Sequence, residues 1–154
     1  VVPDRDNRWL KAQWCMVRAQ YFPELSELDH YQVVWSNRPQ RRVLGSCNWR
    51  RRVVRVAREM RHPQALPWLS ALLYHEMCHA VIGKGVRRTS RGFAWHGPEF
   101  RALEQRHPDI QGMDHWIRSG GWLHVVRSTR ASECHLLAKR RRASRHGGLR
   151  TAKL

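Results

Sequence analysis

The chain has 154 residues, of which 42% are hydrophobic and 8 are Trp, enough apolar surface for one packed domain, and this composition excludes an intrinsically disordered chain. It carries 29 Lys and Arg against 12 Asp and Glu, and the formal net charge of +17 favours a polyanionic partner, most commonly nucleic acid. No run approaches ~18 consecutive apolar residues, so the sequence predicts no transmembrane helix.

Only 4 of the 29 basic residues are lysine, and a GC-rich genome also produces an excess of arginine. Such a genome would not explain the shortage of acidic residues. The four cysteines form no C-x-x-C pair, and the first residues lack the apolar stretch of a signal peptide. We therefore expect free thiols and a protein of the cytoplasm, nucleoid or nucleus that is not secreted.

The first part of the chain predicts one helix followed by strands. Apolar residues recur at helical spacing from Leu10 to Tyr21, with Asp6 or Asn7 as N-cap and Pro23 beyond the end. Three later segments are rich in β-branched and aromatic residues and predict strands, the last two antiparallel to one another: residues 31–36, 41–49 and 51–59.

The middle of the chain changes to a helical period. Residues 62–85 place apolar side chains three and four positions apart and predict a central, buried helix, with Pro67 in its first turn. A basic loop follows over residues 84–95, and Pro98 then begins a short helix. Further on, residues 121–128 ("GWLHVVRS") suggest a strand, and residues 131–154 a helix that continues into a basic tail.

The sequence "HEMCHAV", which begins at His75, carries the clearest chemical signal. On a helix, His75 and His79 lie on one face about 5–6 Å apart, so both imidazoles can bind one metal ion. Glu76 lies about 100° further round the helix and can contact a water on that ion. His96 stands at the start of the next helix as a third ligand, and an unpaired Glu on so apolar a helix would be costly without a role.

The segments "LLYHEMCHAVIG" and "HGPEF" resemble the SprT-like (Spartan-type) zinc metalloprotease family, and the upstream "VVWSNRPQRRVLGSC" and "VVRVARE" extend the likeness over about residues 9–108. The resemblance implies one catalytic Zn²⁺ bound by His75, His79 and His96, with Glu76 as the general base. It also implies an α+β, minimal zincin-like fold: an N-terminal helix, a small, mainly antiparallel three-stranded sheet, the central H-E-x-x-H helix and a short following helix.

The resemblance implies a metalloendopeptidase that cleaves proteins bound or crosslinked to DNA, as in DNA–protein crosslink repair. Its partners would be a protein substrate and DNA, single-stranded or junction-like, and we expect a monomer that does not bind membranes. A SprT-like domain would span residues 7–110, an extension of uncertain fold residues 111–138, and a flexible basic tail residues 139–154. Many relatives carry a Cys-rich C-terminal zinc module, whereas Cys134 is the single cysteine after His96 in this sequence, so we expect no second zinc site.

Two alternatives remain open: a general zincin peptidase or amide hydrolase without nucleic-acid dependence, and a basic nucleic-acid-binding module with structural zinc. For the DNA contacts, the candidates are clustered basic residues, some in the loop before the third histidine: Arg50, Arg51, Arg52, Arg87, Arg88, Lys139, Arg140, Arg141 and Arg142.

Several residues have a simpler structural interpretation. Cys78 is expected in the core, and Glu99 in the first turn of its helix, where a carboxylate favours the helix dipole. Trp49 and Trp95 are the tryptophans to test for base stacking. The strand at residues 53–59 precedes the catalytic helix and is a candidate for backbone pairing with a substrate.

Overall fold

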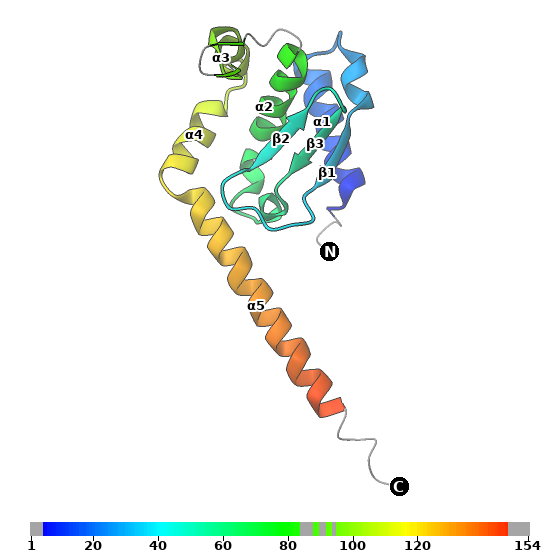
Figure 1. Ribbon diagram of the computed structural model, residues 1–154, viewed down its shortest axis with the longest axis vertical. Coiled ribbons are helices and arrows are strands. Elements are labelled where there is room, and N and C mark those ends of the chain that lie inside the picture. Colours follow the sequence, from blue (N-terminus) through cyan, green and yellow to red (C-terminus); the bar gives the residue numbers. More distant parts are fainter. Residues whose placement is uncertain (1–4, 84–87, 90–91, 94, 148–154) are drawn as a thin grey trace.

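The computed structural model describes residues 5–83, 88–89, 92–93 and 95–147 (Figure 1). A three-stranded sheet lies against two helices, α1 (Asn7–Tyr21) and α2 (Leu69–Ile82), which also pack on each other. The strands are β1 (Gln32–Trp35), β2 (Gly45–Asn48) and β3 (Val53–Val56). Buried apolar side chains between sheet and helices form the core, and the fold class is α+β as expected.

The sheet has the order β1-β3-β2, with β1 and β3 parallel and β2 and β3 antiparallel. The predicted antiparallel pairing of the second and third strands is therefore confirmed, but the sheet is mixed rather than mainly antiparallel. β3 lies in the centre and has no free edge in this sheet, so the strand proposed to pair with a substrate was wrongly chosen. β2 pairs only with β3 among the described strands, and it is the edge strand that packs against α2.

Helix α1 follows directly from its sequence. The Asp6 side chain accepts a hydrogen bond from the backbone N–H of Trp9 at 2.9 Å, which satisfies one of the free donors at the helix start. Leu10, Trp14 and Val17 are buried on one face of this helix. Asp6 is thus confirmed as the N-cap.

Helix α2 is the central, apolar helix that the sequence predicts, and most of its side chains from Leu69 to Cys78 are buried. Pro67 lies just before it in a short 3-10 helix, Leu66–Trp68, and Gly83 is its C-cap. In the loop that follows, the structure describes a small antiparallel hairpin of β4 (Arg88–Thr89) and β5 (Gly92–Phe93). Two further 3-10 helices are η1 (Ser26–His30) and η2 (Arg58–Arg61).

Three more helices follow in the described part of the chain: α3 (Pro98–Glu104), α4 (Ile110–Arg118) and α5 (Gly121–Gly147). The strand suggested for residues 121–128 was wrong, because these residues form the first turns of α5. Trp122, Val125 and Val126 are buried, and their spacing of three and four positions matches a helix face better than an alternating strand.

Helix α5 leaves the rest of the molecule and projects beyond it (Figure 1). Its N-terminal part packs on α4 and η2, and an ion pair at 2.8 Å between Arg58 and Glu133 holds its middle. From Cys134 to Arg145 its side chains are exposed. Among the described helices, none is long and apolar enough to cross a membrane.

Candidate metal and catalytic centre

Helices α2 and α3 bring the three predicted histidines together. His75 and His79 are one turn apart on α2, with ring centroids 5.0 Å apart. His96 immediately precedes Gly97, the N-cap of α3, so the chain turns back towards α2 at this point. Each histidine offers one ring nitrogen, and these three nitrogens lie within 4.8 Å of one another. Such a group can hold a metal ion.

The nitrogen positions favour a tetrahedral zinc site. The Nε2 atoms of His79 and His96 lie 3.2 Å apart, and two nitrogens on one tetrahedral Zn²⁺, each bound at about 2.0–2.1 Å, would be separated by about 3.3 Å. Phe100 packs against all three rings, with centroid distances of 5.2 Å to His75, 4.5 Å to His79 and 4.9 Å to His96. This buried ring of α3 supports the three imidazoles from one side.

Glu104, at the end of α3, fixes the orientation of His75. Its Oε1 lies 2.5 Å from Nδ1 of His75. The hydrogen bond to His75 lowers the pKa of Glu104, so the carboxylate is ionised and accepts the bond while Nδ1 donates it. Nε2 of His75 then keeps a free lone pair, which is the state that a metal ligand needs.

Glu76 is a buried carboxyl group, with only 3% of its surface exposed. Burial raises its pKa to about 7, and the neighbouring His75 opposes this increase. The group therefore gains or loses a proton near neutral pH, which suits a general base. A cation bound by the three histidines would lower that pKa and favour the ionised form.

The three histidines differ in their affinity for protons. Burial, together with His75 and His96, lowers the pKa of His79 to about 4, and burial and His75 lower the pKa of His96. Burial also disfavours protonation of His75, but the hydrogen bond to Glu104 and nearby carboxylates raise its pKa overall. His79 and His96 are thus held neutral, as metal binding requires.

The edge strand β2 lies directly beside Glu76. A Cβ atom added to Gly45 would come within 2.7 Å of Oε1 of Glu76, closer than real Cβ contacts allow. Beside the histidines, a recess of about 410 Å³ is lined by His75 and His96 and by Arg101, Glu104 and Arg118. The group thus combines a buried carboxyl group, Glu76, with an exposed histidine, His96.

The predicted basic residues fall into separate groups. Arg50–Arg52 are exposed in the turn between β2 and β3, which packs through Trp49 against Gly83 at the end of α2. Lys139–Arg142 lie on the projecting part of α5. The N-terminal part of α5 contacts η2, which follows the C-terminal end of β3, whereas Arg50–Arg52 precede its N-terminal end. Arg88 is in β4, and Arg87 lies outside the described residues.

Some candidates have a structural role. Cys78 is buried, as expected. Trp49 packs on α2 with the Arg50 guanidinium 5.3 Å from its ring centroid, whereas Trp95 is 44% exposed. His115 and His124, two further histidines of the C-terminal half, are exposed and line neither of the two recesses next to His75.

Sequence reasoning missed two acidic residues near His75. Glu104 follows Phe100 by four positions, so both share the face of α3 that meets the histidines. This spacing could have predicted that Glu104 lies near the histidines. Asp114 raises the pKa of His75 from α4, and no local pattern links it to the motif, because the approach of α4 to α2 is a tertiary contact.

Comparison with known proteins gives one result. The family model described as SprT-like family matches residues 13–116, which is more than half of the chain. Neither the curated proteins nor the solved structures contain a match to this sequence. The matched segment includes all three histidines and Glu76, and this family implies a domain of the metalloprotease type. The chain belongs to the SprT-like family.

Proposed function

We propose that this protein is a zinc-dependent metalloendopeptidase with a zincin-like fold that cleaves proteins bound or crosslinked to DNA. The observation that carries the peptidase part is the convergence of three histidine ligand atoms beside a buried glutamate on the same helix. Three ligands leave one coordination position open, whereas structural zinc sites are usually closed by a fourth protein ligand. This arrangement favours an enzyme over a binding module with structural zinc.

The donor set fits zinc, because imidazole nitrogens suit this ion and Glu104 prepares His75 as a ligand. Bound there, Zn²⁺ would polarise the scissile carbonyl and lower the pKa of the attacking water. Glu76 would accept a proton from the attacking water and donate it to the leaving amine. Its position beside the three histidines and its burial support this role, and a cation bound there would favour the ionised form that accepts the proton.

The edge strand β2 is positioned to bind the substrate backbone. Gly45 contacts Glu76, so a peptide paired with the free edge of β2 would run past the base. Main-chain hydrogen bonds of this kind select few side chains, which suits an enzyme that meets many different proteins.

A cleavage assay with matched variants tests the peptidase activity. The zinc-loaded chain should cleave an unfolded protein, and Glu76→Gln should lower the rate by at least about 10²-fold while the zinc content stays near one per chain. Glu27→Gln, a change to an exposed acid of η1 that lines neither recess, is the control and should retain activity. Equal cleavage by wild type and Glu76→Gln would show that the mechanism is wrong.

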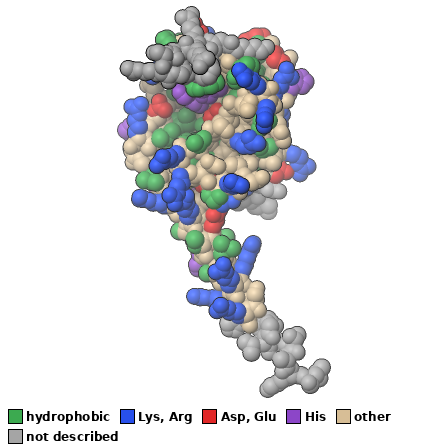
Figure 2. Space-filling view, in the orientation of Figure 1, with side chains coloured by type: hydrophobic (Ala, Val, Ile, Leu, Met, Phe, Trp, Pro, Cys, Tyr) green, Lys and Arg blue, Asp and Glu red, His purple; other side chains and the backbone are tan. Residues whose placement is uncertain are grey.

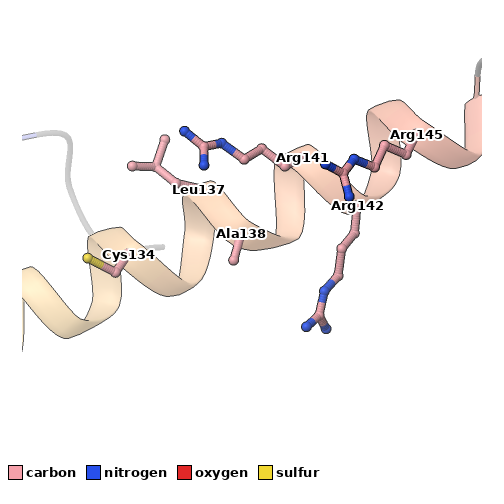
Figure 3. Close-up of a pocket in the computed structure, with 6 residues that line it drawn as sticks. All are labelled: Cys134, Leu137, Ala138, Arg141, Arg142 and Arg145. Carbon is pink, nitrogen blue, oxygen red and sulfur yellow. The ribbon is translucent and has the colours of Figure 1, made fainter.

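The DNA part of the proposal rests on charge. Figure 2 shows Lys and Arg side chains spread over the face in view and along α5, with few acidic ones between them. On α5, Arg141 and Arg145 point to the same side as Leu137, whereas Arg142 points away (Figure 3). A helix with cations on several sides can reach phosphates of a strand that passes beside it.

Adding DNA to the same assay separates the alternatives. Stimulation of cleavage by single-stranded or junction DNA, and retention of the protein on a DNA column at moderate salt, support the proposed substrate. Cleavage without stimulation or retention would favour a general peptidase or amide hydrolase. Retention without any cleavage would favour a nucleic-acid-binding module.

A further inference from the structure

A second recess, of about 250 Å³, lies on the other side of His75 and shares Glu76 with the catalytic centre. Three elements form it: the segment that leads into β2, the helix α2 and the helix α4. Its apolar lining consists of Val43, Leu44, Leu72, Met113 and Ile117.

The exposure of the lining side chains increases from the bottom of the recess to its mouth. Leu72 and Met113 are each only 3% exposed, Leu44 and Ile117 are half-buried, and Val43 at the mouth is 50% exposed. In the space-filling view, hydrophobic side chains lie next to histidine side chains in the upper part of the molecule (Figure 2). The floor is thus formed by the core itself.

We propose that this apolar recess binds an uncharged aliphatic side chain of the substrate residue next to the scissile bond. The inference rests on the proposed peptidase function. Because His75 and Glu76 line the recess, and successive residues of an extended peptide are about 3.3 Å apart, we assign the side chain inside it to a residue that flanks the bond at which Glu76 acts.

The apolar lining of the recess predicts which substrate side chains it binds best. An aliphatic side chain would cover Leu72 and Met113, removing apolar surface from water on both partners. A charged side chain would lose its hydration among carbon atoms. Apart from His75 and Glu76 of the catalytic centre, the charged residues of the recess are Arg42 and Asp114, which are exposed and of opposite sign. We expect Leu, Ile, Val or Met to exceed Ala at that position by about tenfold or more in kcat/KM.

Helix α4 forms one wall of the recess. Met113 and Ile117 are four positions apart and share one helix face, while the exposed Gln111 lies away from them. Replacing Ile117 with Glu would place a negative charge in the wall, and the preference should shift towards Lys and Arg. Gln111→Glu adds the same charge to the same helix outside the recess.

The experiment is cleavage of a complex peptide mixture by the zinc-loaded full chain, with the cleaved bonds mapped by mass spectrometry. Wild type should show aliphatic residues enriched at one of the two positions that flank the bond. Ile117→Glu should reduce that enrichment at least about tenfold and favour Lys or Arg, and Gln111→Glu should keep the wild-type pattern. Val43→Glu, at the exposed mouth, provides a second variant if Ile117→Glu does not fold.

Three outcomes would overturn the inference. Cleavage that disappears in Glu76→Gln but shows no aliphatic preference at either flanking position would refute the recess assignment alone. An aliphatic preference that is unchanged in both Ile117→Glu and Val43→Glu would also refute the recess assignment. If no Glu76-dependent cleavage occurs at all, the proposed peptidase function fails and this inference fails with it.

Discussion

Oε1 of Glu104 lies 2.5 Å from Nδ1 of His75, so the last residue of α3 orients a histidine of α2. Removing the charge of Glu104 weakens this hydrogen bond and allows the ring to rotate or change tautomer. We expect Glu104→Gln to lower zinc affinity by about 10- to 100-fold, because partners that hydrogen-bond to a ligand contribute this much to metal binding. Competition with a zinc chelator measures the affinity directly.

The neighbouring Gln105 offers a control for this variant. Gln105→Ala changes a residue of the same recess that does not contact His75 in any described hydrogen bond, and zinc affinity should be retained. Equal affinities of wild type and Glu104→Gln would show that His75 needs no such support.

Gly45 provides the second prediction. Because a Cβ at this position would lie 2.7 Å from Oε1 of Glu76, Gly45→Ala must displace either the base or the edge strand. Mispositioning a catalytic group by about 1 Å can cost about 10²-fold in rate, and we expect a loss of this size in kcat with zinc still bound. Ser46→Ala, at the exposed next position of β2, is the control and should remain active.

The sequence predicts the convergence of the three histidines well because its signal is local. His75, Glu76 and His79 are tied by helical spacing, and the Gly-Pro pair after His96 marks the start of a helix. Gly97 and Pro98 therefore place the third ligand without any knowledge of the fold. The structure brings these residues together as expected.

What the sequence did not predict depends on packing between distant segments. Nothing in β1 indicates that it pairs parallel to β3, because that register depends on the connection through β2. The two adjacent valines of "GWLHVVRS" suggested a strand, yet the fit of Trp122 and Val125 against the core selects a helix. The recess wall of α4 was missed for the same reason.

The third prediction concerns the pH dependence of stability in the zinc-free protein. The folded-state pKa of Glu76, about 7, lies above its usual 4.5, so the folded state binds this proton more tightly than the unfolded state does. The resulting stability is fully present below pH 4.5 and is lost as the pH rises through 7. The pKa difference corresponds to about 3 kcal/mol of unfolding free energy.

Glu76→Gln removes this titration while conserving shape. Chemical denaturation in the presence of a chelator, from pH 4.5 to pH 8, should show similar stabilities at the acid end. At pH 8 the variant should be more stable than wild type by about 3 kcal/mol. Parallel profiles for the two proteins would contradict the burial of an ionisable carboxyl group at this site.

The fourth prediction separates the two groups of basic residues in DNA binding. If the projecting helix α5 contacts phosphates, replacing Arg140, Arg141 and Arg142 with Ala should weaken binding to duplex DNA. The slope of log K against log salt concentration should also become smaller in magnitude by about 2 to 3, because each lost phosphate contact lowers it by about 0.9. Replacing the exposed Arg8, Arg38 and Arg106 changes the net charge equally and serves as control. Arg50, Arg51 and Arg52, replaced together, test the turn beside the end of α2 in the same titration. A salt slope that falls equally in all three variants would mean that DNA responds to net charge alone, and a fall confined to the turn variant would assign binding to the catalytic end of the molecule instead of α5.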